Sequence, residues 1–213
     1  NDHEENMKIG ICNVGIGGAY GFGSNRLRES LNLYNIPWEK YIFVNSYPPG
    51  SPSHQEQPYA FKLHAMKYAL DQGCDILIWA DSAVWAINGN VGGLISYIEK
   101  NKYYFLHSGY SIGQWSSDKC LSAMGMDRDR DRLHDAAVSP MLMACFMGFY
   151  VKDPSVRKFL DEMMYWSLRN NGETLIGDWK NDQGQVSSDI RCTGHRHDQS
   201  VVSILAKKHD IKL

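Results

Sequence analysis

Short apolar runs alternate with amphipathic segments along this chain. Continuous apolar runs cover residues 8–14 and 75–80, whereas residues 59–72 and 198–208 carry apolar side chains at helical spacing. Buried strands that are separated by helices of ~10–14 residues are typical of α/β folds. The pattern therefore predicts an α/β fold with a central sheet that is parallel at least in its first half.

The same pattern gives the expected element boundaries. We expect strands at residues 8–14, 38–45, 75–80, 103–107 and 141–151, helices at 24–34, 59–72, 91–100, 117–124, 154–169 and 198–208, and irregular structure at 170–194. Ser24 is the expected N-cap of the first helix. Ligands of such sheets bind beyond the carboxyl ends of the strands, which selects residues 13–23, 45–53 and 81–85 as the rim of a site.

Length and charge limit the organisation and the partners. A chain of 213 residues suits one domain, residues 1–213, and a net charge of −2 offers no general attraction for nucleic acid or anionic membrane. No window approaches the ~18–20 apolar residues of a membrane span, and the polar, acidic start is unlike a secretory signal. Five cysteines, without a CxxC pair, suit a reducing compartment. We therefore expect a soluble cytoplasmic protein.

A glycine-rich segment, residues 15–23, follows the first expected strand. Phosphate-binding loops occur at this position, but Tyr20 replaces the third glycine of G-x-G-x-x-G. A P-loop would continue after Gly23 with Lys and Ser or Thr, and the chain has Ser24-Asn25 instead. The segment is therefore expected to be either a flexible substrate loop or a plain connection.

Asp81 comes directly after the apolar strand 75–80, with Ser82 beside it and Trp79 and Trp85 on either side. A carboxylate at the carboxyl edge of a sheet is suited to hold a divalent cation that bridges the protein to a substrate diphosphate. A turn or helix N-cap role for Asp81 is the alternative.

The densest group of chemically active side chains is Gly194-His195-Arg196-His197-Asp198-Gln199-Ser200, at the start of the last expected helix. Asp198 alone would be read as an N-cap. The spacing resembles the H-x-H-x-D-H zinc motif of metallo-β-lactamase-like hydrolases, although Asp198 is one position early and Ser200 stands in place of the last histidine. Lys62, near the start of the second helix, is either a phosphate contact or a surface lysine.

These segments together resemble a known family. The residues Pro58-Tyr59-Ala60-Phe61-Lys62, the strand end Trp79-Ala80-Asp81-Ser82-Ala83 and the run from Gly194 to Ser203 look like nucleotide-sugar glycosyltransferases of the GT-A fold. Over nearly its full length the chain resembles the N-terminal glycosyltransferase domain of a chlorovirus protein that builds glycans of the major capsid protein. The resemblance implies one GT-A-like (Rossmann-like) domain with a central, mostly parallel sheet of about six strands flanked by helices.

The resemblance also implies roles for single residues. The first strand and its loop, here Asn13 and Val14, would hold the nucleotide together with Ser82. Asp81, which matches the first aspartate of the family's D-x-D motif, would bind Mn²⁺ or Mg²⁺ on the diphosphate. Ala83 occupies the second position of the family's D-x-D motif, so His195, His197 or water would complete the metal shell. Lys62, Arg196 and His197 would neutralise the diphosphate, and Asp198 would act as general base on the acceptor.

The expected function is transfer of a hexose from a UDP-sugar to a glycan or glycoprotein acceptor, in the host cytoplasm if the protein is viral. Two alternatives stay open. One is a metal-dependent hydrolase that uses His195, His197 and Asp198. The other is a carbohydrate-binding module without turnover, which the missing second aspartate suggests. Acceptor choice would then depend on loops such as 108–115 and 170–194, or on a partner.

Overall fold

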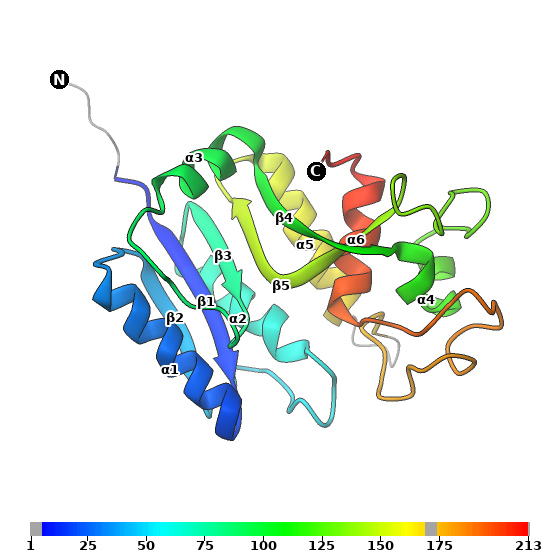
Figure 1. Cartoon of the computed structure of the whole chain (residues 1–213), viewed down its shortest axis with the longest axis horizontal. Coiled ribbons are helices and arrows are strands. Elements are labelled where there is room, and N and C mark those ends of the chain that lie inside the picture. The colour runs from blue at the N-terminus through cyan, green and yellow to red at the C-terminus, as the bar shows by residue number, and fades with distance from the viewer. Residues whose placement is uncertain (1–5, 169–173, 213) are drawn as a thin grey trace. The chain divides into compact units, whose positions relative to one another are not determined.

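The protein is an α/β structure with one open, mixed sheet of five strands and flanking helices, seen here in a computed structural model that describes residues 6–168 and 174–212 (Figure 1). The strand order is β2-β1-β3-β5-β4. The elements, in chain order, are β1 Ile9–Gly15, α1 Gly18–Leu33, β2 Glu39–Val44, α2 Ala60–Asp71, β3 Ile76–Ala80, α3 Gly92–Asn101, β4 Tyr103–Ser111, the 3₁₀ helix η1 Ile112–Trp115, α4 Asp118–Ala123, β5 Pro140–Tyr150, α5 Pro154–Leu168 and α6 Asp198–Lys208.

Strand direction is where the sheet differs from expectation. The strand β1 pairs in parallel with β2 and with β3, but β3 pairs antiparallel with β5. Five strands and an antiparallel neighbour replace the expected sheet of about six mostly parallel strands. An apolar run that is buried on both faces looks the same in sequence whichever way the strand runs, so direction could not be predicted from it.

Backbone contacts divide the chain into two units. The first contains the described residues up to Ser51, together with His64–Tyr104 and Cys145–Arg157. The second contains Pro52–Leu63, Phe105–Ala144 and the described residues from Lys158 onward. The single domain over residues 1–213 stays a prediction.

In the first unit, β3 is buried on both faces, and its successive side chains point to opposite faces of the sheet. One face of the sheet packs against α1 and α3 in a single apolar cluster, whose buried members are Ile11, Leu27, Leu31, Ile36, Trp38, Ile76, Ile78, Ala80 and Ile98. On β2, Ile42 packs on this cluster, while its neighbours Tyr41 and Phe43 contact Tyr68 of α2 edge to face. The helix α2 therefore covers the opposite face.

The start of α1 was predicted wrongly. The helix begins at Gly18 and not at Ser24, and Gly17, with φ of 83°, is its N-cap. Much of the glycine-rich segment is therefore helical and not a loop. Ser24 lies inside the helix, and its hydroxyl donates a 2.5 Å hydrogen bond to Asn13 Oδ1. Because glycine has a low helix propensity, the sequence pattern did not predict a helix over these residues.

In the second unit, most residues of α6 are buried. The predicted inward residues Val201, Val202 and Leu205 are fully buried, and Ser203 accepts the Leu142 backbone N–H at 2.9 Å. Residues 174–194 form neither helix nor strand apart from one bridge between Asp182 and Gly194. The expected last residue of the helix 154–169 and the first four residues of the expected irregular segment 170–194 lie outside the described residues. No helix in the described part of the chain has the length and apolar character needed to cross a membrane.

Candidate functional site

Asp81 stands at the carboxyl end of β3, where the sequence placed it. Its carboxylate is half-buried and accepts a 2.7 Å hydrogen bond from the Trp79 indole N–H. Its backbone N–H donates to the Cys145 carbonyl at 2.8 Å, so the neighbouring strand fixes the main chain as well. The side chain is thus held in a defined position at the sheet edge.

Asn13 and Ser82 are buried and bonded to one another and to Ser24. The Asn13 amide donates to the Ala80 carbonyl at 2.7 Å, and the Ser82 hydroxyl donates to the Val14 carbonyl at 3.2 Å. Ser24 completes the network, 3.1 Å from Ser82. Val14 is only 5% exposed. The polar side chains of Asn13 and Ser82 therefore connect β1, α1 and the end of β3 through hydrogen bonds. A nucleotide at this edge would contact the backbone and neighbouring residues.

The N-terminus of α1 lies at this same edge, immediately after β1. The first helical bond runs from the Gly21 N–H to the Gly17 carbonyl, and the Gly17 N–H donates to the Asn45 side chain. Gly17 and Gly18 are exposed, and a Cβ atom at either position would meet no atom within 4 Å. The first N–H groups of a helix and its dipole favour an anion at such a position. A carboxylate and a helix N-terminus therefore share one edge of the first unit.

The second unit contains a buried ion pair. Lys62 Nζ lies 2.8 Å from Asp198 Oδ2, each side chain is 4% exposed, and the same ammonium donates to the Ala144 carbonyl at 2.9 Å. Asp198 is the first residue of α6, whose N-cap is His197, so the N-cap interpretation of Asp198 is wrong. Lys62 is likewise not a surface lysine.

His195 is buried, and both of its ring nitrogens are bonded to backbone. Nδ1 accepts the Ser117 N–H at 3.1 Å, which fixes the tautomer, and the protonated Nε2 donates to the Leu175 carbonyl at 2.8 Å. Burial lowers the pKa of His195 to about 4, so the ring is neutral at pH 7. Neither nitrogen is available to a metal in this arrangement, which argues against the predicted ligand role.

His197 is bonded in a similar way. Nδ1 donates to the Ile176 carbonyl at 2.7 Å, and Nε2 lies 2.7 Å from the Asn181 amide. Burial is the main cause of a lowered pKa at His197. The residue has φ of 54° and ψ of −124°, a backbone conformation that costs of order 1–3 kcal/mol outside glycine. Together the two histidines hold residues 175–181, and they do not form an open pair of ligands.

Arg196, between them, is exposed. Its guanidinium lies 4.1 Å from the centre of the Trp115 ring in a cation–π contact, and its backbone N–H donates to the Trp115 carbonyl. The side chain lies on an aromatic surface, and it remains the one member of the 195–198 cluster that solvent reaches freely.

Sequence reasoning missed an aromatic group around His197. The Tyr59 and Trp179 rings lie 5.2 and 5.8 Å from the His197 ring, and His54 contacts both of them at 4.8 and 4.9 Å. Trp179 is 49% exposed and Tyr59 36% exposed. The available signal was a tryptophan in an otherwise polar, glycine-containing stretch.

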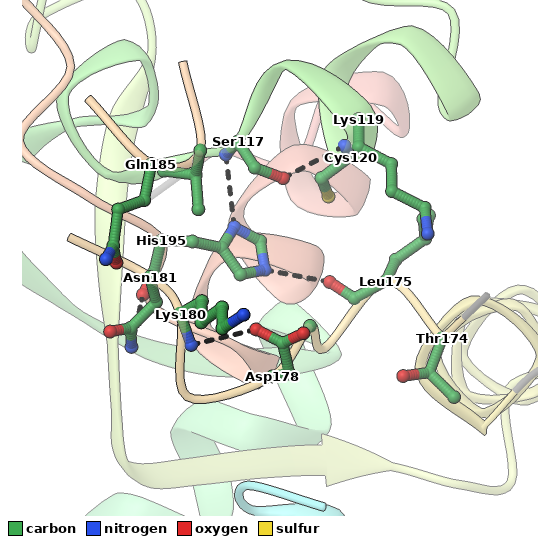
Figure 2. Close-up of a pocket in the computed structure, with 12 residues that line it drawn as sticks. Ser117, Lys119, Cys120, Thr174, Leu175, Asp178, Lys180, Asn181, Gln185 and His195 are labelled. Carbon is green, nitrogen blue, oxygen red and sulfur yellow. Dashed lines mark hydrogen bonds between the residues drawn. The ribbon is translucent and has the colours of Figure 1, made fainter. Parts of the chain in front are cut away.

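A cavity of about 240 Å³ lies beside His195. Figure 2 shows the imidazole between the Ser117 N–H and the Leu175 carbonyl, with Lys119 and Asp178 at the margin. The lining presents polar and apolar atoms and consists of Ser117, Lys119, Cys120, Thr174, Leu175, Gly177, Asp178, Lys180, Asn181, Gln185, Val186 and His195.

The predicted residues thus fall into two groups: Asn13, Val14, Asp81 and Ser82 in the first unit, and Lys62, His195, Arg196, His197 and Asp198 in the second. Among residues 6–168 and 174–212, no three His, Cys, Asp or Glu side chains are placed to hold a metal ion together. No protein-family model matches the chain, and neither does any curated protein.

Proposed function

We propose that this protein is a glycosyltransferase that moves a hexose from a UDP-sugar to a glycan acceptor. As in the GT-A fold that the sequence resembles, the donor would bind at the carboxyl edge of the sheet. The observation that carries the proposal is the position of Asp81, fixed by Trp79 at the carboxyl end of β3 and at the same edge as the N-terminus of α1. A carboxylate that holds a cation, next to helix N–H groups, is suited to the diphosphate of a nucleotide-sugar.

The residues present fit one kind of metal site. Mg²⁺ and similar ions are commonly held by one or two carboxylates, with phosphate and water oxygens as the other ligands. Asp81 can supply the single carboxylate, and His195 is left out of the shell because both of its nitrogens are bonded. When bound, Mn²⁺ or Mg²⁺ would neutralise charge on the leaving diphosphate.

The protein itself would orient the metal ligand, stabilise the phosphate charge and supply the general base. The Trp79 indole orients Asp81, and the first N–H groups of α1 stabilise negative charge on phosphate oxygens. In the proposal Asp198 is the general base, and its ion pair with Lys62 means that it is a carboxylate, the form that accepts a proton. Because Asp198 is only 3% exposed, it would act on a hydroxyl brought to it and not on bulk water.

A test measures sugar transfer and slow donor hydrolysis with Mn²⁺ and after chelation. We expect Asp81→Asn to lose metal-dependent hydrolysis and transfer together. Asp198→Asn should keep UDP binding but lose transfer by roughly 10²–10⁴-fold. Asp71→Asn, an exposed change in a surface ion pair, is the matched control. Undiminished activity in both site variants would overturn the assignment.

The hydrolase alternative receives less support. A two-histidine zinc site needs nitrogen lone pairs that point to one centre, whereas His195 and His197 direct theirs at the Ser117 N–H and the Asn181 amide. Stoichiometric zinc in the purified protein would favour the hydrolase alternative. Capsid-glycan synthesis and a cytoplasmic location belong to the same proposal. The first follows from the family resemblance, and the second from the five cysteines without a CxxC pair.

A further inference from the structure

The second unit has an exposed pair of aromatic rings next to the carboxylate that the proposal makes the base. Tyr59 directly precedes α2, and Trp179 belongs to the irregular segment before α6. Their ring centres are 6.4 Å apart, and the planes are tilted by 49°. Large apolar surface is left open to solvent here, in a segment that is otherwise mostly polar.

The pair is held rigidly. The Trp179 indole N–H donates to the Gln55 carbonyl at 3.1 Å, and the His54 ring packs edge-on against both aromatic rings. The Tyr59 backbone N–H donates to His54 Nδ1 at 3.0 Å. A flat ligand would therefore meet a surface that is already ordered, which reduces the entropy lost on binding.

The rings are close to the buried ion pair. Lys62 Nζ lies 5.8 Å from the centre of the Tyr59 ring and 2.8 Å from Asp198 Oδ2. Both aromatic rings contact His197, the residue directly before Asp198. A ligand on the ring surface would lie within a few side-chain contacts of that carboxylate.

The histidines explain why Trp179 stays in place. His195 and His197 bond to the carbonyls of Leu175 and Ile176, and the Asp182–Gly194 bridge closes the other end of the segment. Their role is to position the segment that carries the tryptophan.

The chemistry of the surface points to a sugar. An aromatic face is electron-rich, and the axial C–H bonds on one side of a pyranose ring carry partial positive charge, so the two stack. Next to Trp179, the exposed side chains of Asp178 and Lys180 can hydrogen-bond with hydroxyl groups at the ring edge.

We propose that Tyr59 and Trp179 form the acceptor site, on which the terminal pyranose of a glycan stacks while one of its hydroxyls approaches Asp198. This inference rests on the proposed function for the acceptor role, but stacking of a pyranose can be tested without turnover. It makes Trp179 a specificity-determining residue for acceptors that present an apolar sugar face.

The binding test uses ligand-observed saturation-transfer NMR with a panel of methyl hexopyranosides. We expect signals concentrated on the axial C–H face with the native chain, a loss of roughly tenfold in affinity in Trp179→Ala, and partial retention in Trp179→Phe. Tyr165→Ala, which removes an exposed aromatic side chain from α5, is the matched control and should bind like the native chain. Thermal unfolding of each variant checks that it is folded.

The kinetic test separates this inference from the proposed function. In Trp179→Ala, the acceptor KM should rise by about tenfold while donor hydrolysis without acceptor stays within twofold of the native rate. Trp179-dependent pyranoside binding without donor turnover would support sugar stacking on Tyr59 and Trp179 and would overturn the glycosyltransferase proposal. Unchanged pyranoside binding and unchanged acceptor KM in folded Trp179→Ala would overturn the proposal that Tyr59 and Trp179 form the acceptor site.

Discussion

At His195, burial and two backbone hydrogen bonds define a neutral imidazole. The side chain that looked most like a metal ligand in sequence is instead the support of a loop, because its nitrogens contact Ser117 and Leu175. The identity of a residue does not reveal which of its atoms are already bonded.

This environment predicts a pH dependence of stability. The unfolded state takes up a proton on His195 near pH 6.5, and the folded state does so only near pH 4. The free energy of unfolding should therefore fall as the pH decreases from 6.5 to 4, by on the order of 3 kcal/mol from this group. Urea unfolding at a series of pH values measures it.

The control compares two variants. In His195→Gln this part of the pH slope should disappear, whereas His107→Gln, which changes an exposed side chain on β4, should keep it. An equal slope in the native chain and in His195→Gln would contradict the neutral, buried assignment.

The Lys62–Asp198 pair predicts strong coupling. Lys62→Met removes the cation from a buried carboxylate and should lower the free energy of unfolding by about 3–5 kcal/mol. The double variant Lys62→Met/Asp198→Leu removes both charges and should recover most of that loss. Chemical unfolding of the native chain, Lys62→Met, Asp198→Leu and the double variant measures the coupling, and additive single effects would show that the pair is not coupled.

At the scale of elements, most boundaries could be predicted, because apolar periodicity is a local property. The strand β3 and the helix α6 were both expected within one residue of their observed bounds. The start of α1 could not be predicted, since its glycines are present for contacts with residues distant in the sequence. A Cβ atom at Gly23 would overlap the Ser82 carbonyl, and one at Gly21 would lie 2.8 Å from Asn45 Oδ1.

The glycines of α1 should therefore differ in their tolerance of alanine. Gly23→Ala forces α1 away from Ser82 and should destabilise the protein by about 1–3 kcal/mol. Gly18→Ala, at the open start of the same helix, should be neutral or stabilising by up to about 1 kcal/mol. Chemical unfolding compares the two, and equal effects would contradict the close approach of α1 to Ser82.

At the scale of the whole molecule, the net charge of −2 means that an anionic ligand must be held by local groups. UDP with Mn²⁺ should therefore raise the melting temperature far more than either alone, since Asp81 supplies a single carboxylate. At a concentration of ~100 Kd the stabilisation is ~2.7 kcal/mol, or roughly 5–10 °C for a chain of this size.

A thermal-shift panel of UDP, GDP and CMP, each with and without Mn²⁺, measures this prediction. GDP and CMP are expected to give smaller shifts than UDP. Asp81→Asn should abolish the part of the shift that depends on the metal, while Asp71→Asn should keep it. No shift with any of the three nucleotides would count against a nucleotide-sugar donor.

The sequence by itself determined the α/β class, nearly all of the elements and the position of Asp81 at a strand end, because each depends on residues adjacent in the chain. Tertiary structure alone decided the antiparallel direction of β5, the burial of Lys62 against Asp198 and the use of His195 and His197 as supports for residues 175–181. These features arise from contacts between residues far apart in the chain, which no local pattern encodes.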